Sequence, residues 1–130
     1  MAKAVVIDDD QDVRDALRSW LEEDGWEVLE AENGEVGATV AILQMPEVIV
    51  LDVMMPVKDG YDTLAEIRED PRSGHIPIIM LTSVNDYELG SRQDADSVGR
   101  RVNVRPPEAF LEKPINWAAF KEALQDALGH

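Results

Sequence analysis

The stretch Ala4-Val5-Val6-Ile7-Asp8-Asp9-Asp10 decides the fold, because it joins a short apolar run to three consecutive acids. Four apolar residues without a polar interruption, most of them β-branched, are typical of a central parallel strand that is buried on both faces. In open parallel sheets the functional groups gather beyond the carboxyl ends of the strands. We therefore expect a buried strand over Ala4–Ile7, with functional side chains in the acidic run that follows.

Four further apolar runs of strand length follow along the chain, and helical patterns separate them. The expected strands cover Trp26–Glu30, Val48–Leu51, Ile76–Leu81 and Ala109–Glu112. Trp26–Glu30 alternates between apolar and polar residues, which places this strand near an edge of the sheet. Strands that alternate with helices predict an α/β fold with a doubly wound, five-stranded parallel sheet and helices on both of its faces.

Apolar residues spaced three and four positions apart predict the helices. The first helix has an apolar face made of Val13, Ala16, Leu17, Trp20 and Leu21. Arg14 and Arg18 lie outside that face, and Gly25 is a suitable C-terminal stop. The second helix is marked by Val36, Val40 and Leu43, and the third by Leu64 and Ile67. The last is marked by Phe120, Ala123, Leu124, Ala127 and Leu128, with Asn116 as its N-cap.

The stretch Val84–Pro107 departs from this pattern. It contains two glycines, few apolar residues and no sustained helical period, and its four arginines balance its four acids. A fourth helix belongs in this position of a five-strand, five-helix scheme. We expect that helix to be short, displaced or replaced by an extended loop.

Length and composition limit what the chain can do. With 130 residues, we expect one domain over residues 1–130 and no separate output domain. The absence of cysteine excludes disulfides and thiolate chemistry, and no apolar run approaches the length of a membrane helix. The formal net charge of −15 repels the phosphate backbone, so nucleic-acid binding is not expected. These features predict a cytoplasmic protein that does not bind membranes.

Polar groups stand at the ends of four expected strands. They are Asp8-Asp9-Asp10, Asp52, Thr82-Ser83 and Lys113-Pro114. Clustered carboxylates either share protons or bind a cation, and oxygen ligands without His or Cys favour Mg²⁺. A lysine and a hydroxyl beside such a site suit transfer of a phosphoryl group onto an aspartate. The alternative is a helix N-cap at Asp8–Asp10 with unrelated polar strand ends elsewhere.

These residues resemble a known family, the CheY-like receiver domains of two-component response regulators. The matching segments are Val6-Ile7-Asp8-Asp9, Leu51-Asp52-Val53-Met54-Met55-Pro56 with Asp59-Gly60, Leu81-Thr82-Ser83 and Phe110-Leu111-Glu112-Lys113-Pro114. The resemblance covers the chain apart from Val84–Pro107. It implies a flavodoxin-like sheet of strand order 2-1-3-4-5, and a phosphoprotein switch rather than an enzyme that acts on other substrates.

The resemblance also assigns roles to the acids. It implies that Asp52 is the phosphoacceptor and that Asp9, Asp52 and the main-chain carbonyl of Met54 bind Mg²⁺. It also implies that Asp8 supports the metal site through water. The phosphoryl donor would be a sensor histidine kinase or a histidine phosphotransfer protein, and a further protein would read the output. We expect a monomer or a weak dimer.

The remaining roles fall on the last two strands. The resemblance implies that Thr82 and Lys113 contact the phosphoryl group, and that Thr82 and Phe110 form the conformational switch. It further implies a cis peptide bond between Lys113 and Pro114. The family's small-residue turn before the aromatic residue is replaced here by Arg105-Pro106-Pro107-Glu108.

Two other functions remain open at this point. The pattern Asp8-x-Asp10, followed by Thr82 and Lys113, is also similar to haloacid dehalogenase phosphatases, in which Asp8 would be the nucleophile. Against it, no acidic pair follows Lys113, and Asp52 has no role. The chain could also be a receiver-like interaction module that is never phosphorylated, although such a module would not need the full set of acids, Thr82 and Lys113.

Overall fold

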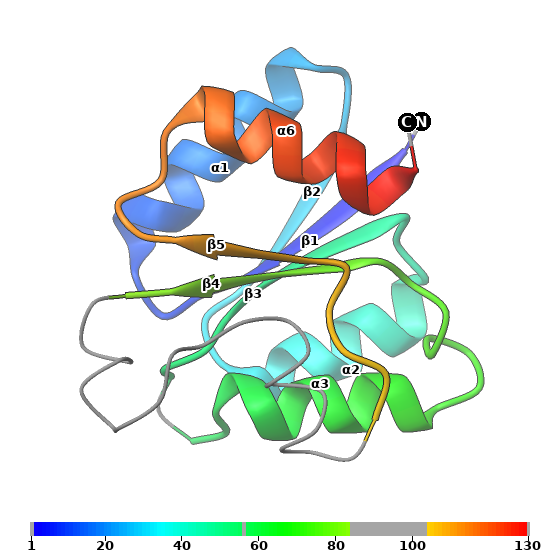
Figure 1. Cartoon of the computed structure of the whole chain (residues 1–130). Helices are drawn as coiled ribbons and strands as arrows, with labels where there is room; N and C mark the ends of the chain where they lie inside the picture. Colours follow the sequence, from blue (N-terminus) through cyan, green and yellow to red (C-terminus); the bar gives the residue numbers. More distant parts are fainter. Residues whose placement is uncertain (1, 56, 84–103, 130) are drawn as a thin grey trace.

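The computed structural model describes residues 2–55, 57–83 and 104–129. Its centre is a parallel five-stranded sheet of order β2-β1-β3-β4-β5, which confirms the expected topology (Figure 1). The strands are β1 (Lys3–Ile7), β2 (Glu27–Ala31), β3 (Val48–Asp52), β4 (Ile78–Thr82) and β5 (Ala109–Glu112). The alternating strand β2 lies at an edge, as its sequence predicts.

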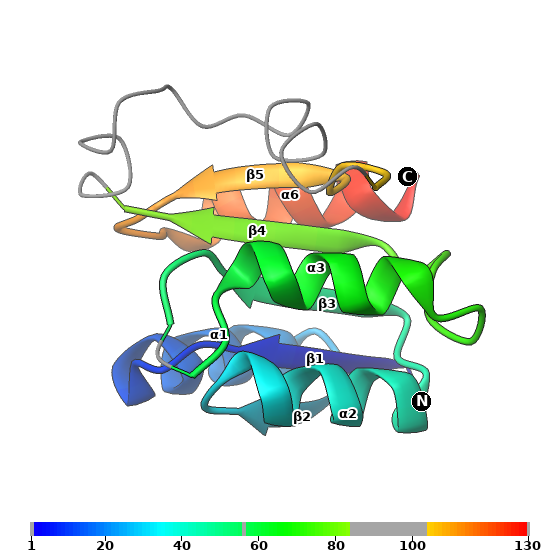
Figure 2. The ribbon, with the colours of Figure 1, turned by 90° about the horizontal axis from the view of Figure 1, so that it is seen from below.

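Helices cover both faces of the sheet. They are α1 (Gln11–Glu23), α2 (Gly34–Gln44), α3 (Gly60–Glu69) and α6 (Trp117–Leu128). Figure 2 shows α2 and α3 in front of the sheet and α1 and α6 behind it. Among the described residues, no helix is long and apolar enough to cross a membrane. The expected short or displaced fourth helix falls on residues 84–103, outside the described residues.

Local sequence signals set the helix ends. The side chains of Asp10, Asn33, Asp59 and Asn116 each accept a hydrogen bond from a main-chain N–H in the first turn of the helix that follows. Gly25, just past α1, adopts a φ of 89°, in the left-handed region that favours glycine. The N-cap at Asn116 and the stop at Gly25 therefore agree with the sequence.

The central strands are buried on both faces because side chains alternate along them. Val5 and Ile7 of β1 join the core beneath α2 and α3, whereas Ala4 and Val6 join the core beneath α1 and α6. Full burial of a Val, Leu, Ile or Phe side chain contributes about 1.5–3 kcal/mol. The sheet therefore has one hydrophobic core on each face.

The buried face of α2 differs from the one that its large apolar residues suggest. Val36 and Leu43 mark the helix correctly but are 45% and 66% exposed. The buried residues are small and bring the helix close to its neighbours; they are Gly34, Gly37, Ala38 and Ala41. A Cβ added to Gly37 would lie 2.6 Å from Ile7 side-chain atoms. Close approach of the backbone therefore decides which side of α2 is buried.

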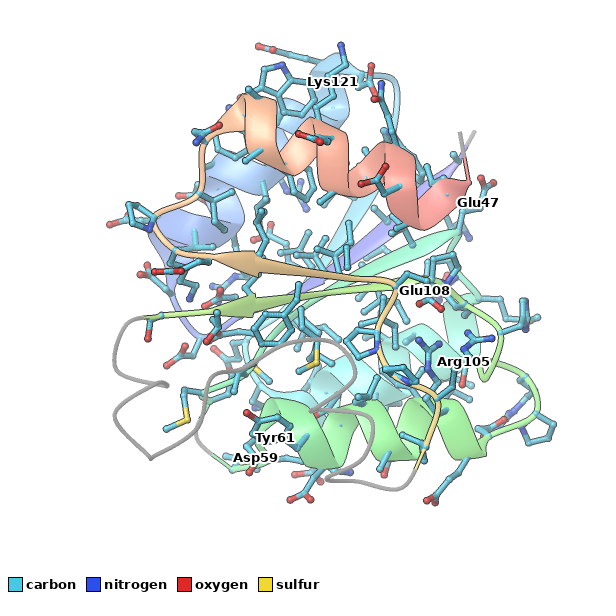
Figure 3. All side chains as sticks on the ribbon, in the orientation of Figure 1. Glu47, Asp59, Tyr61, Arg105, Glu108 and Lys121 are labelled. Carbon is cyan, nitrogen blue, oxygen red and sulfur yellow. The ribbon has the colours of Figure 1, made fainter. Side chains whose placement is uncertain are left out.

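The segment that leads into β5 is held by Arg68 at the end of α3. The Arg68 guanidinium donates hydrogen bonds to the carbonyls of Ile76 and Pro106 at 2.7 and 3.1 Å, and to Glu108 Oε1 at 2.7 Å. Glu108 and Arg105 lie on this segment, over the end of α3 (Figure 3). The same Glu108 oxygen accepts from the N–H of Ile78 at 2.7 Å. These bonds fix the position of β5 beside β4.

Candidate acidic site at the carboxyl edge of the sheet

Asp8 follows β1 and is fully buried. Its N–H donates to the carbonyl of Ala31 at 3.1 Å, and its Oδ1 accepts the N–H of Asp10 at 2.9 Å. The main chain therefore holds both the backbone and one carboxylate oxygen of Asp8. Asp9, the next residue, is exposed, so the two neighbouring acids face different surroundings.

Asp52 ends β3 and is 4% exposed. The loop behind it approaches closely, because the N–H of Gly60 donates to the carbonyl of Val53 at 2.8 Å. A Cβ on Gly60 would collide with the carbonyl of Asp52 and lie 2.7 Å from Val53 Cα. Only glycine fits this position, which accounts for the Asp59-Gly60 pair in the sequence.

Lys113 follows β5 and joins the two buried acids. Its Nζ lies 3.1 Å from Asp8 Oδ2 and 3.2 Å from Asp52 Oδ1. The main-chain N–H of Lys113 donates to the carbonyl of Thr82 at 2.6 Å, which ties it to the end of β4. Thr82 is fully buried, and the peptide bond between Lys113 and Pro114 is cis. Four strand ends thus contribute to one site.

The electrostatics of the site follow from its burial. Burial, together with the charge of Asp8, raises the pKa of Asp52 to about 7, against the opposing effect of Lys113. Burial also raises the pKa of Asp8, against a hydrogen bond from the Asp10 amide and the charge of Lys113. For Lys113, burial lowers the pKa, but the carboxylates of Asp52 and Asp8 outweigh it and raise the pKa overall. The single positive charge of Lys113 does not balance two negative charges on Asp8 and Asp52.

The residues present fit a small, hard cation. Carboxylate oxygens of Asp8, Asp9 and Asp52 all lie within 4.8 Å of one another. Asp8 Oδ2 is buried, and the Lys113 ammonium lies 3.1 Å from it. A set of oxygen ligands without His or Cys suits Mg²⁺ rather than Zn²⁺ or copper.

The structure places the other predicted residues around this cluster. Met54 lies in the loop after β3 and is 51% exposed. Phe110 lies on β5 beside Met80 and packs against the core under α2 and α3. Phe110 therefore precedes Lys113 on the chain and lies within β5, at the side of the site rather than within the group of acids.

Sequence reasoning missed one residue, Arg14. The helical pattern puts it outside the apolar face of α1, yet the residue is only 9% exposed. Its Nη1 donates to the carbonyl of Asp8 at 2.5 Å, and its Nε pairs with Glu30 at 3.1 Å. The missed signal is a cation six positions after Asp8 together with an acid, Glu30, on the neighbouring edge strand.

Comparison with known proteins agrees with this arrangement. The family model described as response regulator receiver domain matches residues 4–125. The chain is 31% identical over 117 residues to protein PilH of Pseudomonas aeruginosa, covering 89% of this chain and 88% of PilH. It is 39% identical over 132 residues to the probable transcriptional regulator ycf27 of Guillardia theta, covering 94% of this chain and 50% of that regulator.

The solved structures give the same result. The chemotaxis response regulator CheY4 of Vibrio cholerae superposes with a TM-score of 0.82 at 29% identity, covering 98% of this chain and 99% of CheY4. The chain spans about a third to a half of the ycf27 regulators that it matches. The phosphatase alternative is not favoured, because these matches have the receiver fold and cover nearly the whole chain. The chain belongs to the family of response regulator receiver domains.

Proposed function

We propose that the chain is a phosphoacceptor switch in which Asp52 accepts a phosphoryl group in a Mg²⁺-dependent reaction. The observation that carries this proposal is the position of Lys113 Nζ between Asp8 Oδ2 and Asp52 Oδ1, beside the exposed Asp9. The donor is a sensor histidine kinase or a histidine phosphotransfer protein. The chain catalyses only its own phosphorylation and dephosphorylation.

The three acids have different roles at this site. Asp9, Asp52 and the main-chain carbonyl of Met54 would hold Mg²⁺, and Asp8 would support the ion through water. When bound, the ion would supply positive charge to the phosphoryl oxygens. We assign the acceptor role to Asp52 because Asp8 is fully buried and its Oδ1 already accepts the N–H of Asp10.

The transfer step conserves atoms and electrons. A carboxylate oxygen of Asp52 forms a bond to phosphorus while the bond from phosphorus to the donor atom breaks, and the donor atom keeps that electron pair. The donor atom is nitrogen in a phosphohistidine and oxygen in a small acyl phosphate. The Lys113 ammonium and the Thr82 hydroxyl stabilise the transferred oxygens by hydrogen bonds.

Phosphorylation would change the contacts of two strands. The new phosphoryl group adds up to about two negative charges and three acceptor oxygens. These draw Lys113 on the β5 side and Thr82 on the β4 side, whose main chains are already joined at 2.6 Å. Phe110 lies on the same strand as Glu112 and precedes Lys113, so the change reaches its packing through β5. A partner protein would read the altered surface.

Incubation with Mg²⁺ and acetyl phosphate, followed by intact-mass measurement, tests the proposal. The wild type should gain one phosphoryl group, and Asp52→Asn should gain none. Asp62→Asn is the matched control, because Asp62 is an exposed acid on α3 and its loss changes the net charge equally. Labelling of Asp52→Asn, or equal labelling in excess chelator, would overturn the proposal.

The same measurement separates the alternatives. Phosphatase turnover that survives loss of Asp52 would indicate Asp8 as the nucleophile. A folded wild type that gains no phosphoryl group from acetyl phosphate or from a cognate phosphohistidine protein would indicate an interaction module without phosphorylation.

A further inference from the structure

Arg14 is a buried cation whose contacts lead directly to the acidic site. Its side chain is 10% exposed, and its three nitrogen donors all have partners. Nη1 donates to the carbonyl of Asp8 at 2.5 Å, Nε to Glu30 Oε1 at 3.1 Å and Nη2 to Gln11 Oε1 at 3.0 Å. The planar guanidinium therefore joins the end of β1, the start of α1 and the edge strand β2.

The contact with Asp8 fixes more than one atom. Because a peptide unit is planar, holding the carbonyl of Asp8 also fixes the orientation of the N–H of Asp9. The Asp8 N–H is held by Ala31 and the Asp10 N–H by Asp8 Oδ1. Arg14 holds the carbonyl of the peptide link between the two acids, and it is the one side chain shown to do so among the described residues.

The charge of Arg14 is already compensated within its own network. Glu30 Oε1 accepts a hydrogen bond from Arg14 Nε at 3.1 Å, and Glu30 Oε2 forms an ion pair with Arg18 Nε at 2.8 Å. The opposite charge that directly contacts the Asp8 and Asp52 carboxylates is instead that of Lys113. The contribution of Arg14 to the site is therefore the placement of the main chain.

We propose that Arg14 is a positioning residue that holds the Asp8–Asp9 peptide link, so that both carboxylates face Asp52 in the geometry that a divalent cation needs. This inference rests on the proposed function, because it concerns the same site. It goes beyond that function by assigning the site's metal affinity to a side chain that touches neither the metal nor the phosphoryl group. Residues that orient metal ligands typically change the affinity by about 10–100-fold when they are replaced.

Magnesium titration of two substitutions and one control tests the inference. Arg14→Gln should raise the Mg²⁺ dissociation constant, followed by NMR amide shifts, by about tenfold. The dissociation constant of Arg14→Lys should lie between those of Arg14→Gln and the wild type. An ammonium can reach one acceptor but cannot bridge two in a fixed plane. Arg18→Gln is the matched control, because Arg18 pairs with Glu30 and the carbonyl of Val28 but does not contact Asp8. It should stay within about twofold of the wild type.

The dependence of phosphorylation on Mg²⁺ gives the second readout. In Arg14→Lys and Arg14→Gln, the Mg²⁺ concentration that gives half the maximal rate with acetyl phosphate should rise. The rate at saturating Mg²⁺ should stay near that of the wild type. A merely structural role would instead lower the folded fraction, which circular dichroism detects, and leave the half-saturating concentration unchanged.

The outcomes are distinct. Wild-type affinity in a folded Arg14→Gln or Arg14→Lys variant would overturn the inference, and so would an equal loss in Arg18→Gln. If the wild type itself neither bound Mg²⁺ nor became phosphorylated, the proposed function would fail first. If Arg14→Gln does not fold, Arg14→Lys decides the question alone.

Discussion

A single buried carboxylate, Asp52, should make the stability of the protein depend on pH. Burial, with the charge of Asp8, raises its pKa from 3.8 to about 7. The folded state therefore binds the Asp52 proton more tightly than the unfolded chain does. The resulting contribution to stability is fully present below about pH 4 and is lost as the pH rises through about 7.

Asp52→Asn should remove this dependence in the metal-free protein. At pH 7.5 the variant should be more stable than the wild type by about 1–3 kcal/mol, because the buried side chain at position 52 then no longer has to ionise. Lys113 keeps Asp8 as a partner in the variant. Urea denaturation at pH 4.5, 6.0 and 7.5 in chelator measures the difference, which should grow with pH. A difference that stays constant over this range would contradict the raised pKa.

Val57 holds a backbone conformation that a β-branched residue rarely adopts. Its φ is 71° and the residue is 76% exposed, so burial does not explain the presence of valine at this position. Val57→Asn should stabilise the protein by about 0.5–1 kcal/mol, since asparagine tolerates the left-handed region. Thermal unfolding at fixed pH measures the gain. A loss of stability would mean that the valine side chain makes a favourable contact in the loop.

Among the elements, α2 owes its position to small residues rather than to large apolar ones. Alanine usually favours a helix over glycine by about 1 kcal/mol. Gly37→Ala should nevertheless destabilise the protein by about 1–2 kcal/mol, because the new Cβ would lie 2.6 Å from Ile7 side-chain atoms. Thr39→Ala, on the exposed side of the same helix, is the control and should be neutral or slightly stabilising.

A double mutant checks the physical reason. Ile7→Val removes one of the three Ile7 carbons that the new Cβ would meet. Gly37→Ala should therefore cost less in the Ile7→Val background than in the wild type, and chemical denaturation of the four proteins gives this coupling. If Gly37→Ala destabilised both backgrounds equally, the strain would come from a contact other than the one with Ile7.

Strands and caps follow closely from local sequence, whereas helix faces do not. The runs Ala4–Ile7 and Val48–Leu51 are continuous and β-branched, and both form central strands. Asn116 caps its helix through a contact three residues away, which spacing alone can predict. The buried face of α2 and the burial of Arg14 depend instead on partners from β1 and β2. Helical periodicity cannot identify such partners.

The acidic site could be predicted at the scale of the whole molecule because one rule of topology brings its residues together. Asp8, Asp52, Thr82 and Lys113 are far apart in sequence, but all follow parallel strands and so meet at the same edge. The ion pairs of Lys113 at 3.1 and 3.2 Å confirm that these strand ends converge. The raised pKa of Asp52 depends on the depth of burial, which the sequence pattern does not specify.

Binding of Mg²⁺ should stabilise the whole fold. A ligand that binds only the folded state at tenfold excess over its dissociation constant adds about 1.4 kcal/mol. For a chain of this size, the melting temperature should rise by roughly 5 °C. NaCl of matched ionic strength is the control, since salt alone screens the net charge of −15. Asp9→Asn should reduce the shift, and an equal rise with NaCl would argue against a metal site.

The three tryptophans give the molecule an uneven optical signal. Trp20, Trp26 and Trp117 all pack on the core under α1 and α6, and Trp20 and Trp117 are 5.9 Å apart between ring centroids. The opposite core, under α2 and α3, has Tyr61 and Phe110 packed at its margin but no tryptophan. Intrinsic tryptophan fluorescence therefore reports on the core under α1 and α6 and not on the core under α2 and α3. Loosening of α2 and α3 would lower the circular dichroism before it changes the tryptophan emission, so comparing the two probes would show whether the faces unfold together.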